Sequence, residues 1–332
     1  MLLMIKELLK ALLSMLFSPS RMLGRGWLSE LITRTIRGLF DTAYHQSWGW
    51  MRSALANIEL PSPYFSKVHF SNKSIAGIPC LLVMDKNNFD LSKTQPESVE
   101  TVIIYLHGGG YVVGSPNTSH KALVAGLAAT NKNTLIIAPD YRLAPEYPFP
   151  QPQNDCVNVV QACLAQYPTS KVIVAGDSAG AGLAIDTARQ LSLAAQRESK
   201  SSGIAGLVLL SPWVDPLAKG GSMTQNQAND YLTLPFLHKS FDALMQGANP
   251  NHERVNFTQT DLSMLPKTLV QSGTGELFFD QIQDFNARIS HQGVDCTVQN
   301  FKAQFHVFQL YSPILKQARI AMDNIAQFIE SV

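Results

Sequence analysis

The fold is decided by residues 171–180, which read KVIVAGDSAG. The first five residues predict a short buried strand, because they are mostly β-branched and apolar. The next five, Gly176 to Gly180, have the pattern G-x-S-x-G, and an alanine-rich stretch that predicts a helix over about 180–197 follows them. A serine at the apex of such a strand–turn–helix is a nucleophile elbow. Ser178 is therefore the candidate nucleophile, with a helix N-terminus behind it that favours negative charge.

Strands and helices alternate on both sides of this turn. Further strands are predicted over 78–84, 101–106, 134–139, 204–210, 267–271 and 294–300. Further helices are predicted over about 117–130, 153–166, 280–291 and 312–330. Such alternation indicates an α/β fold with a mostly parallel central sheet and helices on both faces. The strands are continuously apolar, as expected of strands covered on both faces, whereas residues 53–75 are interpreted as an irregular connection.

Two segments interrupt the alternation and suggest a division into domains. Residues 1–55 are interpreted as an N-terminal cap of amphipathic helices, and residues 56–332 as the catalytic domain. Within that domain, residues 213–263 are rich in Gln, Asn and Gly and are interpreted as a cap insertion. Open α/β sheets bind ligands at the carboxyl ends of their strands, so we expect both cap segments there.

The composition excludes several classes of protein. Hydrophobic residues make up 45% of the 332 residues and charged residues 15%, which excludes a disordered chain and a charged coiled coil. The formal net charge is only +1, which argues against a nucleic-acid partner. The four cysteines form no C-x-x-C pair, so we expect reduced thiols and neither a zinc site nor a disulfide scaffold. This pattern, without a convincing secretion signal, favours the cytoplasm.

The first 17 residues, MLLMIKELLKALLSMLF, predict a helix that is apolar except for one narrow polar arc. Such a helix rises about 25 Å, which is short for a hydrocarbon core of roughly 30 Å. Two interpretations stay open. The helix either lies on a membrane surface, with residues 1–40 making the contact, or packs over the rest of the protein, including its active site.

A second motif predicts an oxyanion hole. His107-Gly108-Gly109-Gly110-Tyr111 follows the strand over 101–106 directly. Three successive glycines free the backbone to aim N–H groups at one point, as a developing oxyanion requires. The N–H of Ala179, directly after the nucleophile, is the natural additional donor.

A serine nucleophile needs a base, and the base needs an acid that orients it. In a fold with this elbow, the chain order is Ser, acid, His. His306 lies just beyond the last predicted strand and is the candidate base. Glu276 follows the strand over 267–271 and is the candidate acid, with Asp280 as the alternative.

Together these residues resemble the hormone-sensitive-lipase-like family of α/β-hydrolases. The resemblance covers roughly residues 75–330, and it rests on HGGGY at 107–111, DYRLAPE at 140–146, GDSAG at 176–180 and His306. It implies an α/β-hydrolase fold with a helical cap and a Ser178–His306–acid triad. It also implies esterase activity on short- to medium-chain esters, with no metal or organic cofactor. The family usually has Asp-Pro-Leu at the acid, where this chain has Glu276-Leu277-Phe278.

The resemblance also suggests roles around the triad. It implies that Gly109, Gly110 and Ala179 donate to the oxyanion and that Gly108 shapes the loop of the oxyanion hole. It further implies that the loop containing DYRLAPE supports the glycine loop. The expected supporting residues are His107, Asp140, Tyr141 and Arg142.

Other functions remain compatible with the sequence. A deacetylase or amidase acting on a bulky hydrophobic molecule, such as a sterol or an arylamide, would use the same triad. A non-catalytic receptor for a small molecule is a further alternative on this scaffold, although His306 is present, and so is a peripheral membrane scaffold. The expected partner is a small-molecule ester, and a homodimer is left open.

Overall fold

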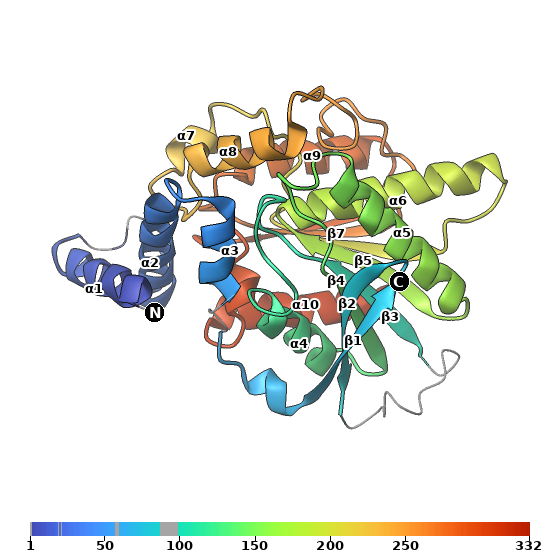
Figure 1. Ribbon diagram of the computed structural model, residues 1–332, viewed down its shortest axis with the longest axis horizontal. Coiled ribbons are helices and arrows are strands. Elements are labelled where there is room, and N and C mark those ends of the chain that lie inside the picture. Colours follow the sequence, from blue (N-terminus) through green and yellow to red (C-terminus); the bar gives the residue numbers. More distant parts are fainter. Residues whose placement is uncertain (1, 19, 21, 57–59, 87–98) are drawn as a thin grey trace.

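The computed structural model describes residues 2–18, 20, 22–56, 60–86 and 99–332 (Figure 1). Within them, one eight-stranded sheet has the order β1-β2-β4-β3-β5-β6-β7-β8. Its strands are β1 (Val68–Ile75), β2 (Ile78–Asp85), β3 (Thr101–Leu106), β4 (Thr134–Pro139), β5 (Lys171–Asp177), β6 (Ile204–Leu210), β7 (Lys267–Gly273) and β8 (Cys296–Phe301). β2 is antiparallel to β1 and β4, and all other neighbours are parallel. The α/β-hydrolase fold and the mostly parallel sheet are therefore confirmed.

Helices cover both faces of this sheet. The helices are α1 (Leu2–Phe17), α2 (Trp27–Ala43), α3 (Trp48–Ala56), α4 (Lys121–Thr130), α5 (Gln151–Gln166), α6 (Ala179–Arg197), α7 (Ser222–Gln225), α8 (Leu234–Met245), α9 (Phe279–His291) and α10 (Lys316–Ser331). Successive side chains of a strand point to opposite faces. Val102 and Ile104 of β3 accordingly belong to the same core cluster as side chains of α5, α6 and α9, whereas Ile103 belongs to the cluster of α4 and α10.

One prediction for the sheet was wrong. Residues 68–75, interpreted as part of an irregular connection, form β1 at the edge of the sheet. This strand reads VHFSNKSI, and only Val68 and Ile75 at its two ends are buried. The side chains between these ends are exposed or only partly buried, and most of them are polar, so this edge strand lacks the apolar run by which the other strands were predicted.

The N-terminal helices pack against the segment between β6 and β7. The ring of Phe40 in α2 lies 4.7 Å from that of Phe236 in α8, centroid to centroid. The Lys239 ammonium of α8 donates to the carbonyl of Tyr44, just after α2, at 2.7 Å. In Figure 1, α1 to α3 accordingly lie at one end of the molecule, close to α7 and α8. None of the helices in the described part of the chain combines the length and the apolar character of a membrane span.

Candidate active site

The parallel strands bring the predicted site residues to one edge of the sheet. β5 leads to Ser178, β6 to Ser211, β7 to Glu276 and β8 to His306, and these strands are consecutive neighbours. The carboxyl ends of parallel neighbours lie at the same edge, so four segments far apart in the sequence meet there.

Ser178 occupies a strained backbone conformation. Its φ is 54° and its ψ is −120°, in a region that non-glycine residues rarely adopt. Two backbone hydrogen bonds hold it there: its N–H donates to the Leu210 carbonyl at 2.9 Å, and its carbonyl accepts from Trp213 N–H at 3.1 Å. A Cβ at Gly180 would overlap the Leu106 carbonyl, so the turn needs glycine there. These contacts present Ser178 between β5 and α6.

Glu276 and His306 form a buried hydrogen-bonded pair. The carboxylate oxygen Oε2 lies 2.8 Å from Nδ1 of His306, and both side chains are almost completely buried. Burial raises the pKa of Glu276, although the hydrogen bond and the charge of His306 oppose the rise. The other carboxylate oxygen accepts from Gly273 N–H at 2.8 Å, which fixes its orientation.

The opposite ring nitrogen of His306 is left available. Nε2 of His306 is buried and has no hydrogen-bond partner among the described residues. With Glu276 ionised, Nδ1 carries the proton, and Nε2 keeps a lone pair that can accept another. In this arrangement His306 can accept a proton at Nε2, as a general base must.

Asp280, the alternative acid, lies elsewhere. Its carboxylate accepts from Ser222 N–H at 2.7 Å, and its own N–H donates to the Ser222 hydroxyl at 3.0 Å. These reciprocal bonds join the first turns of α7 and α9. Of the two candidates, only Glu276 is hydrogen-bonded to His306.

The glycine loop provides backbone donors, but Gly108 is not one of them. Its N–H donates to Oδ1 of Asp177 at 3.0 Å and is therefore not available to an oxyanion. Gly109 and Gly110 have positive φ values of 114° and 62°, and their N–H groups have no acceptor within the described chain. Ala179 is the first residue of α6, and the first N–H groups of a helix have no partner within it.

The side chain beneath this loop is Asp177, which sequence reasoning treated only as the variable residue of the motif. Its carboxylate accepts from the Tyr105 hydroxyl at 2.7 Å and lies 3.2 Å from Nε2 of His120. Burial raises the pKa of Asp177, but His120 and these hydrogen bonds outweigh burial and lower it. A buried carboxylate therefore ties the glycine loop to the turn that carries Ser178.

The supporting residues expected from DYRLAPE divide into two groups. The Tyr141 hydroxyl donates to the His107 carbonyl at 2.7 Å, and the two rings stack with centroids 4.3 Å apart. Tyr141 therefore supports the glycine loop. Arg142 instead binds the carboxylate of Asp155 at 2.6 and 2.9 Å, which anchors α5. The N–H of Asp140 donates to the Pro79 carbonyl at the start of β2.

Asp230 is a further buried residue that the sequence did not indicate. Its Oδ1 accepts from the N–H of His306 at 3.2 Å, and its Oδ2 accepts from the N–H of Leu277 at 2.8 Å. One carboxylate thus joins the loop of His306 to the loop of Glu276. Asp230 belongs to no recognisable motif, so only the fold places it here.

The described residues contain no group of three or more His, Cys, Asp and Glu side chains that could hold a metal ion. All four cysteines are free thiols, as expected.

Comparison with known proteins places this arrangement in a family. A model of the α/β-hydrolase fold matches residues 103–310, which is more than half of the chain. An esterase of Acinetobacter venetianus is 34% identical over 244 residues, which cover 71% of this chain and 76% of the relative. An acetyl-hydrolase of Streptomyces hygroscopicus is 32% identical over 231 residues, covering 69% and 75%.

A solved structure described as an esterase of the bacterial hormone-sensitive lipase family is 25% identical. It superimposes with a TM-score of 0.74, covering 99% of this chain and 97% of that one. The chain belongs to the hormone-sensitive-lipase-like family of α/β-hydrolases. The resemblance expected from the motifs is thereby confirmed, and this hydrolase is a serine enzyme of the carboxylesterase type.

Proposed function

We propose that this hydrolase cleaves carboxylic esters through a Ser178–His306–Glu276 triad. The observation that carries the proposal is the buried pair of Glu276 and His306, which leaves Nε2 of His306 as a free acceptor beside the strained serine turn. Hydrogen bonds join the turn of Ser178, the end of β6 and the loop of His306 at this edge of the sheet. The backbone of Ser178 is bonded to Leu210 and Trp213. The hydroxyl of Ser211, which follows Leu210 in the sequence, accepts from the N–H of Val307.

In the proposed reaction, the Ser178 hydroxyl attacks the ester carbonyl while His306 takes its proton. The N–H groups of Gly109, Gly110 and Ala179 stabilise the resulting oxyanion. His306 then protonates the leaving alcohol, and an acyl group remains on Ser178. Water activated by the same histidine releases the acid. Glu276 stays ionised and holds the imidazole in the required tautomer.

The surroundings of the triad suit a hydrophobic ester. The ring of Phe278 lies 4.9 Å from that of His306, and the ring of Tyr231 lies 6.0 Å from it, centroid to centroid. Both aromatic residues are buried. These two aromatic side chains, together with relatives named as an esterase and an acetyl-hydrolase, support an ester with a short- to medium-chain acyl group as the substrate.

We further propose that residues 1–55 and the insertion at 213–263 act together as the cap of the site. Contacts between α2 and α8 support this, as does Asp230, which brings the insertion to the backbone of His306. The two segments would set the size of the acyl pocket.

The test is hydrolysis of p-nitrophenyl esters from acetate to palmitate by the wild type and Ser178→Ala. We expect the wild type to prefer the shorter esters. We expect the variant to lose activity by several orders of magnitude, because the nucleophile is removed. Asp280→Asn is a matched polar control outside the triad. Ester hydrolysis that persists in a folded Ser178→Ala variant would contradict the proposal, and so would a folded wild type that is inactive on every ester.

A further inference from the structure

Exposed apolar side chains are concentrated near the N-terminus. Of the sixteen large hydrophobic residues that are exposed in the described chain, ten lie between residues 4 and 27. Leu16, Phe17 and Leu23 expose 78%, 81% and 92% of their surface. We call the following ten residues the N-terminal apolar surface: Met4, Ile5, Leu8, Leu9, Leu12, Leu13, Leu16, Phe17, Leu23 and Trp27. Large apolar side chains exposed in such number on one short segment mark an interaction site.

The way α1 packs leaves this surface free. Among the described side chains of α1, only Glu7 and Ala11 are buried. Glu7 fills the space beside Gly38 of α2, where a Cβ would overlap its carboxylate. Figure 1 shows α1 at the margin of the molecule, beside α2 and away from the sheet. The apolar face of α1 is therefore turned outward and does not cover the triad.

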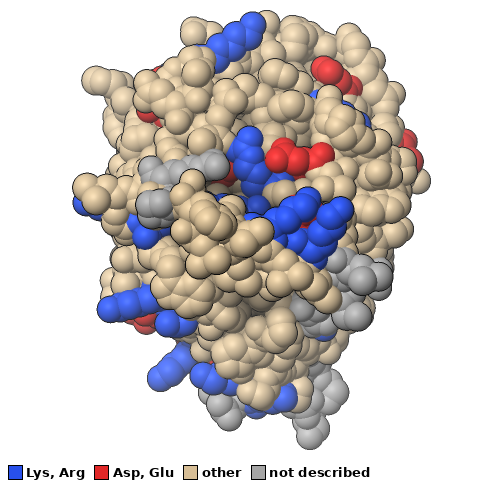
Figure 2. Space-filling model, turned by 90° about the vertical axis from the view of Figure 1, so that its left-hand side faces the viewer, with Lys and Arg blue, Asp and Glu red and all other residues tan. Residues whose placement is uncertain are grey.

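The charges around the surface favour an anionic partner. Lys6 and Lys10 are exposed on α1, and Lys302 lies beside Gly24. Of these, Lys10 also binds the carboxylate of Glu7 at 2.7 Å. The two acidic residues of the first 40, Glu7 and Glu30, are both buried. Figure 2 shows this side of the molecule, on which Lys and Arg side chains gather and Asp and Glu are sparser.

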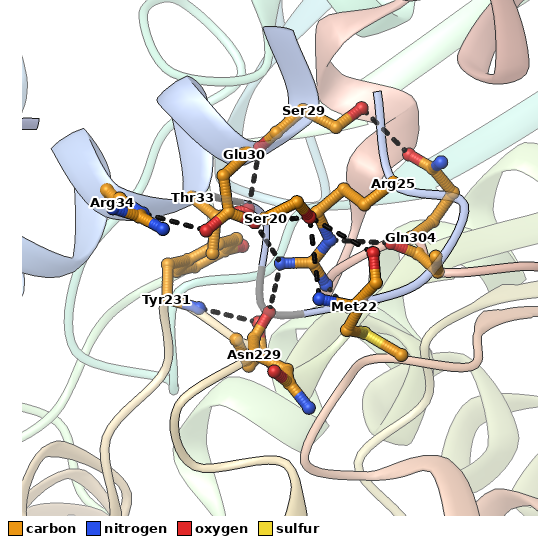
Figure 3. Close-up of polar contacts among 12 residues, drawn as sticks. Ser20, Met22, Arg25, Ser29, Glu30, Thr33, Arg34, Asn229, Tyr231 and Gln304 are labelled. Atoms are coloured by element: carbon orange, nitrogen blue, oxygen red, sulfur yellow. Dashed lines mark hydrogen bonds and ion pairs between the residues drawn. The ribbon is translucent and has the colours of Figure 1, made fainter. Parts of the chain in front are cut away.

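The segment that follows α1 is anchored next to the catalytic loops. The buried guanidinium of Arg25 donates to the Ala303 carbonyl at 2.8 Å and to the Asn229 carbonyl at 2.6 Å (Figure 3). The Ser29 hydroxyl donates to Gln304 at 3.3 Å in the same cluster. Ala303 and Gln304 precede His306, and Asn229 precedes Asp230. The apolar surface therefore has a fixed position relative to the site.

We propose that the N-terminal apolar surface docks on the interface of a membrane that contains anionic phospholipids. Lipid acyl chains would bury the leucines and Phe17, Trp27 would lie at the headgroup level, and the lysines would contact lipid phosphates. A second copy of this chain is a poorer partner. A symmetric contact would bring Lys6 of both copies into the same apolar interface, without an exposed carboxylate among the same residues to pair it. The docking does not depend on the proposed ester hydrolysis.

The experiment is flotation of the full-length protein with vesicles, either of phosphatidylcholine alone or of phosphatidylcholine mixed with phosphatidylglycerol. We expect stronger binding to the mixed vesicles. The double variant Leu13→Gln with Leu16→Gln should bind at least tenfold more weakly, because two apolar anchors are lost. Ile314→Gln alters an exposed apolar residue outside the surface and is the matched control, which should bind like the wild type.

A variant with fewer positive charges tests the electrostatic contribution to membrane binding. Lys6→Gln with Lys302→Gln should weaken binding to mixed vesicles, by about fivefold for each lysine removed, and leave binding to neutral vesicles unchanged. Far-UV circular dichroism serves as the check on folding for every variant.

Two results would overturn the proposal. One is a folded wild type that stays unbound to both kinds of vesicle. The other is a wild-type dimer, measured by light scattering, that the leucine variant dissociates while vesicle binding is absent, because the surface would then be a subunit interface.

Discussion

At the residue scale, Glu276, the proposed triad acid, shows how side-chain identity and position act together. Glu276 has one methylene more than the aspartate that is usual in the family, yet its carboxylate reaches Nδ1 of His306 at 2.8 Å. The same carboxylate accepts from Gly273 N–H, so the longer side chain is held at both oxygens. Asp280, four residues later, has a carboxylate that is engaged by Ser222 N–H instead.

Replacing each acid by its amide should therefore distinguish the role of Glu276 from that of Asp280. Glu276→Gln presents an amide to His306, which disturbs its tautomer, so we expect kcat to fall by a factor on the order of 10³ to 10⁴. Asp280→Asn should keep kcat near the wild-type value and lose stability instead. Steady-state kinetics with a p-nitrophenyl ester and urea unfolding of both variants measure these effects. A large fall in kcat for Asp280→Asn alone would reverse the assignment.

At the element scale, the N-terminal helices are held by a few buried polar contacts. Arg25 is 6% exposed and satisfies the carbonyls of Ala303 and Asn229 from two distant segments. Its neighbour Glu30 also binds Arg34 at 2.7 Å, at the start of α2. Buried carbonyls without donors are costly, so this cluster determines how firmly α1 and α2 are attached.

Arg25→Gln should loosen this attachment. Because it removes the donors of one buried and one partly buried carbonyl and a partner of Glu30, we expect the free energy of unfolding to fall by about 3 kcal/mol. Hydrogen exchange should speed up first in α1 and α2. Arg319→Gln removes the same charge at an exposed site and should behave like the wild type. Unchanged exchange in α1 and α2 of Arg25→Gln would show that other contacts hold them.

At the scale of the whole molecule, stability depends on a histidine that is buried and uncharged. Burial, with a smaller contribution from His120, lowers the pKa of His107 from 6.5 to about 3. Between those values the unfolded chain binds a proton at this residue and the folded protein does not. Acidification therefore favours the unfolded state, and the free energy of unfolding rises with pH across this window.

The pH dependence can be measured by urea unfolding between about pH 4 and 7. His107 should contribute up to about 1.4 kcal/mol of lost stability for each pH unit below 6.5. His107→Gln lacks the titrating ring, so its stability should depend less steeply on pH, whatever its stability at pH 7. His291→Gln, at the exposed end of α9, should follow the wild-type slope. Equal slopes for all three proteins would show that His107 is not responsible.

The sequence by itself determined the parts of this protein that rest on local patterns. The buried strands appear as apolar runs, and the turn at Ser178 appears as two glycines around a serine, because each is a property of adjacent residues. The family followed from the same short motifs. The edge strand β1 was not predicted, because its polar sequence has no such apolar run.

Contacts between residues that are far apart in the sequence were known only from the tertiary structure. It chose Glu276 over Asp280 as the partner of His306, and it engaged Gly108 N–H with Asp177. It also placed Asp230 between the loops of Glu276 and His306 and turned the apolar face of α1 outward. Hydrogen bonds and burial join residues up to hundreds of positions apart, as Arg25 and Ala303 show, and no local pattern records such pairs.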